Sequence, residues 1–104
     1  MIRYNKLVRD KIPEIIEQSG KECTVEVMDD ETYIKYLDQK LNEELAEYQE
    51  DKALEELADL LEVIYAVVKA RGYSMEELES CRRQKIEKRG GFEKKLLLKE
   101  TFDK

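Results

Sequence analysis

The sequence has 104 residues, of which 42% are charged and 41% are hydrophobic, and its formal net charge is −6. This length predicts one domain over residues 1–104, and the negative charge excludes general electrostatic binding to nucleic acid polymers or anionic membrane surfaces. The chain has no histidine and only two cysteines, which lie far apart in the sequence. It therefore cannot form a zinc cluster or a histidine-based catalytic site.

The N-terminal region predicts a short helix after a basic stretch. Residues 1–15 lack an apolar signal region, and nothing in the chain reaches the roughly 18 apolar residues of a membrane span. We therefore expect a soluble, cytoplasmic protein. Asp10 is a suitable N-cap and Pro13 is tolerated in a first turn, which predicts a helix over residues 11–18 that Ser19-Gly20 stops.

The middle of the chain predicts an extended segment followed by two long helices. Residues 22–28 alternate in polarity and are rich in Val and Thr, which favours an extended conformation. Apolar residues then recur every three or four positions, which predicts an amphipathic helix over residues 31–50. The pattern changes phase near Asp51-Lys52, and a second helix is predicted over residues 52–70, ended by Gly72.

The C-terminal third predicts one more helix and a tail. Ser74 and Glu77 form an S-x-x-E capping box for a helix over residues 75–89, which Gly90-Gly91 stops. Our hypothesis for the tail is an extended segment, residues 92–102, that pairs with residues 24–28. The predicted fold is all-α, a helical bundle built on an antiparallel helix hairpin with a small extended segment.

Eight carboxylates lie between Asn42 and Asp59, and such a run is usually a solvated helix face. In an antiparallel hairpin, however, residues at the same level share a constant sum of residue numbers. Glu44 with Asp59 and Glu47 with Glu56 both sum to 103. Within each helix the two residues are three positions apart, on one face. The numbering therefore predicts that four carboxylates converge between the two helices.

The second predicted helix is apolar on nearly every side, a pattern typical of a helix buried by several neighbours. Asp59 is therefore expected in a poorly solvated position. Clustered buried carboxylates repel one another, so either their pKa values rise or a cation joins them. Oxygen ligands without histidine or cysteine select Mg²⁺ or Mn²⁺. Glu43 adjoins this cluster and either lies on the surface or serves as an outer partner.

The same acids carry a resemblance to a known family. "EELAE" (Glu43 to Glu47) followed by "ELAD" (Glu56 to Asp59) resembles the EExxE…ExxD motif of the MazG-like all-α nucleoside triphosphate pyrophosphohydrolases, relatives of the phosphoribosyl-ATP pyrophosphohydrolases and dimeric dUTPases. The opening "YNKLVRDKIPEI" and the later "KIEKRGGF" are similar to the small phosphoribosyl-ATP pyrophosphohydrolase-like subgroup, so the resemblance spans nearly the whole chain. The spacer between Glu47 and Glu56 is shorter than in many such proteins, and we expect it to tighten the hairpin.

The resemblance implies Mg²⁺-dependent hydrolysis of a nucleoside triphosphate between its α and β phosphates, giving the monophosphate and pyrophosphate, as in the removal of noncanonical nucleotides. It assigns the metal ligands to Glu44, Glu47, Glu56 and Asp59, the four residues that the hairpin numbering selects. The metal would neutralise phosphate charge and activate a water, with Glu44 or Glu43 orienting or deprotonating that water. Phosphoribosyl-ATP is an alternative substrate, and the sequence sets no base preference.

Four basic residues also match the family's motifs. Lys85 and Arg89 match its KxxxR pattern, and Lys6 and Arg9 belong to the subgroup's opening motif. The resemblance implies that these side chains bind substrate phosphates, Arg in a bidentate geometry and Lys as a point charge. The alternative is that they balance the acidic surface and cover apolar neighbours.

The second predicted helix has more apolar surface than a chain of this length can cover, so we expect a homodimer or homotetramer. A competing interpretation is a non-catalytic helical dimerisation module whose acids only solubilise it. The two differ at Glu56 and Asp59, which in the second case would tolerate Ala and show no dependence on metal.

Overall fold

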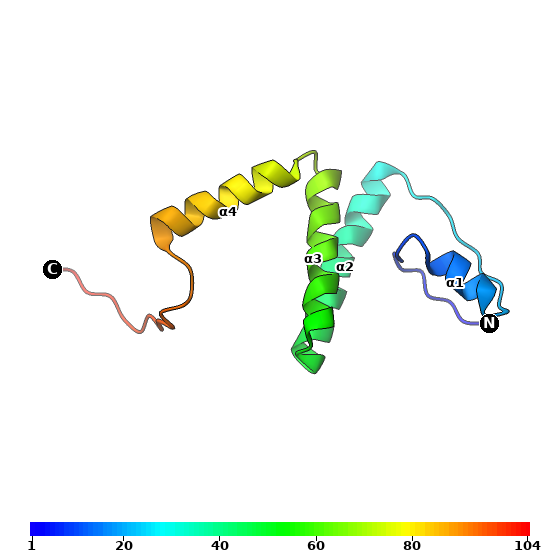
Figure 1. The fold of residues 1–104 in the computed structure, drawn as a ribbon, viewed down its shortest axis with the longest axis horizontal. Helices are drawn as coiled ribbons and strands as arrows, with labels where there is room; N and C mark the ends of the chain where they lie inside the picture. Colours follow the sequence, from blue (N-terminus) through cyan, green and yellow to red (C-terminus); the bar gives the residue numbers. More distant parts are fainter.

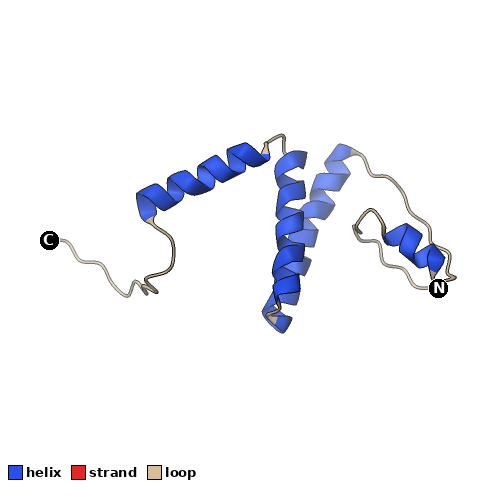
Figure 2. Cartoon of the chain, in the orientation of Figure 1, coloured by secondary structure: helices blue, strands red, loops and turns tan.

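The computed structural model describes residues 1–104 and contains four helices and no strand (Figure 2). The predicted all-α class is therefore confirmed. None of the helices combines the length and the apolar character that a membrane crossing requires. The helices are α1 (Ile12–Gln18), α2 (Asp30–Asp51), α3 (Leu54–Ala70) and α4 (Met75–Arg89).

The long helices α2 and α3 lie side by side as an antiparallel hairpin at the centre of the molecule (Figure 1). α1 lies on the α2 side, and α4 projects from the opposite side, so the molecule is elongated, with extents of 67 × 31 × 22 Å. The predicted pairing of residues 92–102 with residues 24–28 is wrong, because α4 carries the tail away from the N-terminal region. Neither segment forms a strand, since a lone strand has no partner for its backbone hydrogen bonds.

The hairpin turn consists of two residues. The last turn of α2 is closed by Lys52, whose backbone is left-handed (φ 57°) and whose N–H donates to the Tyr48 carbonyl. Ala53 is extended and serves as the N-cap position of α3. The second helix thus begins at Leu54 rather than at Lys52, because a left-handed residue cannot start a right-handed helix. Such a short link forces α2 and α3 to be antiparallel neighbours.

Two further helix ends carry the caps that were predicted from the sequence. Ser74 and Glu77 form the predicted capping box of α4. Gly72 (φ 88°) follows α3, and its N–H donates to the Lys69 carbonyl while the Tyr73 N–H donates to that of Val68, a Schellman motif.

The predicted N-cap of the first helix, Asp10, is wrong. The cap position is Lys11, which makes no side-chain hydrogen bond, and Pro13 lies in the first turn of α1. Since proline has no N–H to satisfy, this helix start needs less capping than most.

The core is small and lies between α2 and α3. Only Leu37 and Glu44 are buried, with exposed fractions of 2% and 7%. The expectation that the second long helix is buried by several neighbours is wrong for the single chain, because no residue of α3 is buried. α2 covers one side of α3, and α4 contacts only α3 and none of α2.

Candidate metal centre

The hairpin brings four carboxylates together. Glu44 and Glu47 come from α2, Glu56 and Asp59 come from α3, and one oxygen from each lies within 4.8 Å of all the others. The convergence predicted from the residue numbering is present in the structure. The convergence has two causes. On each helix the two acids are three residues apart and therefore lie on one face, and the short turn aligns the two faces at the same level.

The most buried member of the cluster is Glu44 rather than Asp59. The Glu44 side chain is 9% exposed, whereas that of Asp59 is 39% exposed. The expectation of a poorly solvated Asp59 is therefore wrong. Asp59 directs its carboxylate to the exposed Arg9 of the N-terminal segment, whereas Glu44 is buried in the α2–α3 contact.

Two carboxylate oxygens in the cluster are buried without a hydrogen-bond partner. They are Oε2 of Glu44 and Oε2 of Glu56. A buried acceptor that accepts no hydrogen bond is costly, and each such group needs an explanation. Both glutamates belong to the set of four residues that each place one carboxylate oxygen within 4.8 Å of the others, and oxygen-only ligands suit Mg²⁺ or Mn²⁺.

Crowding of negative charge also changes the acidity of the cluster. Burial raises the pKa of Glu44, and the nearby Glu47 carboxylate raises it further. Desolvation raises the pKa of Glu56 as well, again with a contribution from Glu47. Both directions mean that the ionised form of each glutamate is less favourable here than for an isolated carboxylate in water, a cost that a nearby cation would offset.

Two basic side chains already approach the cluster. Arg9 donates from Nη2 to Oδ1 of Asp59 at 2.7 Å and thereby ties the N-terminal segment to α3. Lys40 lies one turn before Glu44, with Nζ 3.5 Å from its Oε1 and 3.3 Å from Oε2 of Glu43. Lys40 was not among the predicted site residues, although its spacing of four residues from Glu44 is a signal for an ion pair.

The remaining predicted site residues lie outside the cluster. Glu43 is 42% exposed and its carboxylate contacts Lys40. Lys6 places its ammonium over the Tyr4 ring, 5.7 Å from the centroid. Lys85 and Arg89 are exposed on α4, which diverges from the hairpin (Figure 1), so a single chain does not bring them to the carboxylates. The sequence does not show this separation of Lys85 and Arg89 from the carboxylates, because the direction of α4 depends on backbone angles in the turn at residues 71–74.

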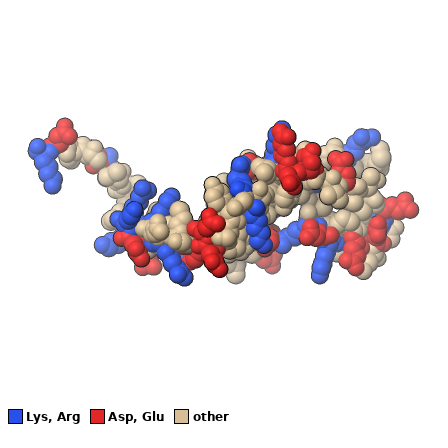
Figure 3. Space-filling view, turned by 90° about the horizontal axis from the view of Figure 1, so that it is seen from above, with Lys and Arg blue, Asp and Glu red and all other residues tan.

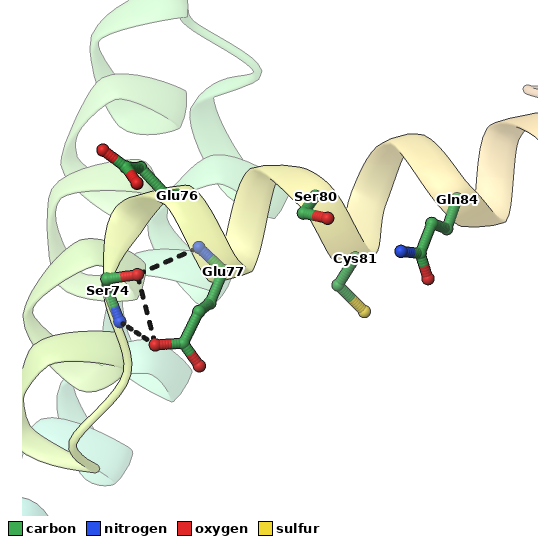
Figure 4. Close-up of a pocket in the computed structure, with 6 residues that line it drawn as sticks. All are labelled: Ser74, Glu76, Glu77, Ser80, Cys81 and Gln84. Atoms are coloured by element: carbon green, nitrogen blue, oxygen red, sulfur yellow. Dashed lines mark hydrogen bonds between the residues drawn. The ribbon is translucent and has the colours of Figure 1, made fainter.

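A separate open hollow runs along α4 (Figure 4) and offers less chemistry. Its polar side chains Ser74 and Glu77 are engaged with each other in the capping box. The other lining residues come from the same helix, so no facing element closes the hollow. Its lining residues are Ser74, Glu76, Glu77, Ser80, Cys81 and Gln84.

Comparison with known proteins assigns no family. No family model matches the chain, and no solved structure matches it significantly. A Mycolicibacterium smegmatis protein described as uncharacterized is 44% identical over 54 residues, which cover 48% of this chain and 55% of that protein. The chain thus spans about half the length of this curated relative.

The Arg9–Asp59 ion pair leads to a testable prediction. Because a bound cation and Arg9 compete for the Asp59 carboxylate, Arg9→Ala is expected to tighten Mg²⁺ binding. The gain is at most about fivefold, since an exposed ion pair contributes up to about 1 kcal/mol. Isothermal titration calorimetry of the wild type and the variant measures this change in Mg²⁺ affinity. Lys6→Ala is the matched control, because Lys6 lies in the same segment and contacts a ring instead of a carboxylate. Equal affinities for the two variants would contradict the competition.

Proposed function

We propose that this chain is a MazG-like nucleoside triphosphate pyrophosphohydrolase that requires Mg²⁺, or Mn²⁺ in its place. It would cleave a nucleoside triphosphate between the α and β phosphates, giving the monophosphate and pyrophosphate, with noncanonical nucleotides as candidate substrates. The proposal rests on the resemblance of the EExxE…ExxD motif and its flanking motifs, and on the all-α hairpin that places the motif's acids together.

The observation that carries the proposal is the pair of buried, unpartnered oxygens on Glu44 and Glu56. A solvated acidic face would leave its carboxylates in water, with their charges screened. Here the acids face one another across the hairpin and two of their oxygens are removed from solvent. This arrangement fits a divalent cation better than it fits a merely solubilising surface.

In this proposal the four carboxylates of Glu44, Glu47, Glu56 and Asp59 hold the cation. A bound Mg²⁺ would neutralise phosphate charge and would lower the pKa of a bound water. Arg9, which uses one nitrogen on Asp59, has further N–H donors for a phosphate oxygen. Two residues are candidates for orienting the water. Glu44 lies within the cluster, whereas Glu43 lies beside the cluster and its carboxylate forms an ion pair with Lys40.

A rival function is a non-catalytic helical dimerisation module. The exposed apolar side of α3 favours it, since Leu54 is 81% exposed and Leu61 is 45% exposed. Exposed apolar stripes of this kind mark interaction surfaces. The rival differs from the enzyme in one respect that can be measured, because it has no use for a divalent cation.

The deciding experiment measures pyrophosphate release from a panel of canonical and modified NTPs and dNTPs, with phosphoribosyl-ATP included. Each substrate is tested with Mg²⁺, with Mn²⁺ and with EDTA. Asp59→Asn and Glu56→Gln are expected to lower turnover by roughly 100-fold or more, as the loss of one electrostatic stabiliser does in other active sites. Glu55→Gln is the matched control, because Glu55 is exposed and adjoins Glu56 on α3.

The two functions give opposite outcomes. Metal-dependent release that survives in Glu55→Gln and is lost in Glu56→Gln supports the pyrophosphohydrolase and ranks its substrates. Absence of cleavage for every nucleotide, together with no Mg²⁺ or Mn²⁺ binding by calorimetry, supports the helical module.

A further inference from the structure

Lys40 differs from every other basic residue of the chain in its burial. Its side chain is 18% exposed, and it is the only one of the 19 lysines and arginines that is not exposed. The other basic side chains lie at the surface, and many of them gather over α4 (Figure 3). Lysine is seldom withdrawn from water without a partner, because its ammonium is strongly hydrated. The withdrawal of Lys40 therefore needs a specific explanation.

The partners of Lys40 are two neighbouring glutamates. Its Nζ lies 3.5 Å from Oε1 of Glu44 and 3.3 Å from Oε2 of Glu43. Lys40 and Glu44 are four residues apart on α2 and thus lie on one face of the helix. The Glu43 side chain is 42% exposed, whereas that of Glu44 is 9% exposed. The ammonium thus contacts both an exposed carboxylate and the buried carboxylate of the cluster.

The stability of α2 does not account for this contact. At a spacing of four residues, an ion pair stabilises a helix more when Glu precedes Lys than in the reverse order. Here Lys40 precedes Glu44, which is the weaker order. The pair also draws an ammonium out of water, which costs solvation free energy. The contact is therefore better explained by what it does to the Glu44 carboxylate.

The contact distinguishes the two oxygens of Glu44. Oε1 faces the Lys40 ammonium, while Oε2 is buried and has no hydrogen-bond partner. A carboxylate that is held at one oxygen does not rotate freely, so the direction of its second oxygen is set as well. Glu44 belongs to the four acids that each place one oxygen within 4.8 Å of the others. Lys40 thus leaves one oxygen of Glu44 free at the point where these acids converge.

Charge alone predicts that Lys40 opposes a bound cation. A fixed ammonium repels a divalent ion, so a lysine that acted only through its charge would weaken Mg²⁺ binding. Arg9 is a case of this kind, because its side chain is 59% exposed and reaches Asp59 from a separate segment, so that a cation can displace it. Lys40 belongs to the same helix as Glu44 and is largely withdrawn from solvent. It therefore stays beside Glu44 when a cation arrives.

We propose that Lys40 is a positioning residue of the carboxylate cluster, whose ammonium holds one oxygen of Glu44 so that the other is directed to the cation. It acts through Glu44 and does not itself touch the cation or the substrate. Outer partners that orient metal ligands in this way typically contribute a factor of about 10–100 to metal affinity. This inference rests on the proposed function, because the cation belongs to that proposal.

Replacing Lys40 with Met tests the proposal, because Met keeps a long unbranched side chain and removes the charge. Calorimetry is expected to show that Lys40→Met binds Mg²⁺ at least roughly 10-fold more weakly than the wild type. Lys40→Arg, which keeps a cation beside Glu44, is expected to restore most of the affinity. Lys35→Met is the matched control, because Lys35 also lies on α2 and is exposed. Equal or tighter binding by Lys40→Met overturns the proposal, since charge alone predicts tighter binding.

Carboxyl-selective NMR separates positioning from a general loss of structure. In the wild type, saturating Mg²⁺ is expected to shift the carboxyl carbon resonances of all four acids of the cluster. In Lys40→Met, also at saturation, the response of Glu44 is expected to be reduced while the other three acids still respond. A response that is reduced alike in all four acids shows a structural effect and overturns the proposal.

A measurement on the wild type avoids any folding defect of the variants. In protein with isotope-labelled lysine Nζ atoms, the Lys40 ammonium is expected to stay protected from proton exchange after Mg²⁺ is added, because it remains on Glu44. Exchange as fast as that of Lys35 would show that Lys40 only replaces the cation in the metal-free protein, which overturns the proposal. If the wild type binds neither Mg²⁺ nor Mn²⁺, the proposed function and this inference are both overturned. If the wild type binds Mg²⁺ and Lys40→Met binds it equally well, this inference alone is overturned.

Discussion

Replacing Glu44 with Gln is expected to stabilise the metal-free protein and to abolish its response to Mg²⁺. Glu44 is the one buried carboxylate, its Oε2 has no partner, and burial raises its pKa above the ordinary value of 4.5. The folded state therefore binds this proton more tightly than the unfolded state does. Stability is lost as the pH rises from about 4.5 through the raised pKa, and at pH 7 the ionised group is unfavourable.

The neutral amide removes that penalty, so at pH 7 without metal the Tm of Glu44→Gln should rise by about 5 °C, the shift that about 1 kcal/mol produces in a domain of this size. Below pH 4 the difference should vanish, because the wild-type carboxyl is then protonated. Adding Mg²⁺ at 100 times its Kd should stabilise the wild type by about 2.7 kcal/mol. The same addition should leave Glu44→Gln nearly unchanged.

Thermal unfolding at pH 4 and pH 7, with and without Mg²⁺, measures both effects. Glu50→Gln is the matched control, because Glu50 is an exposed glutamate on the same helix and lies outside the cluster. It should keep the wild-type response to Mg²⁺. A Glu44→Gln protein that still gains stability from Mg²⁺ would remove Glu44 from the ligand set.

Much of the cluster could be predicted from the sequence because it depends on helix geometry alone. The sums of residue numbers pair Glu44 with Asp59 and Glu47 with Glu56 once α2 and α3 are known to be antiparallel, and a short link makes them so. Helix ends fixed by short-range signals could be predicted for the same reason. Ser74 with Glu77 is one such signal and Gly72 is another.

Features that depend on distant contacts could not be predicted. Which of the four carboxylates is buried depends on how α2, α3 and the N-terminal segment pack around the cluster, and the residue spacing does not show this packing. The Arg9–Asp59 pair joins residues 50 positions apart and has no periodic signal. The spacing of Lys85 and Arg89 shows that they share one face of α4. It does not show how far they lie from the cluster, because the direction of α4 depends on backbone angles at the turn.

Replacing Leu37 with Ala is expected to cause the largest loss of stability of any single truncation in the chain. Leu37 is 2% exposed and is the only buried hydrophobic residue. Truncating a buried Leu removes about 2–5 kcal/mol, from lost burial and from the cavity that remains. Domains of this size are stable by only about 5–15 kcal/mol, so the variant should unfold at markedly lower urea concentration.

Leu45 provides the matched control for this substitution. It lies two turns further along α2 and is 45% exposed, so Leu45→Ala removes much less buried surface. Urea denaturation of the wild type and both variants, followed by circular dichroism, gives the two free energies of unfolding. A loss for Leu37→Ala well above that for Leu45→Ala shows that the α2–α3 contact at Leu37 anchors the hairpin, and hence the register that aligns the four carboxylates. Equal losses would show that the hairpin is stabilised elsewhere, and the exposed apolar residues Leu54, Leu57, Leu61 and Tyr65 of α3 would then be the next to truncate.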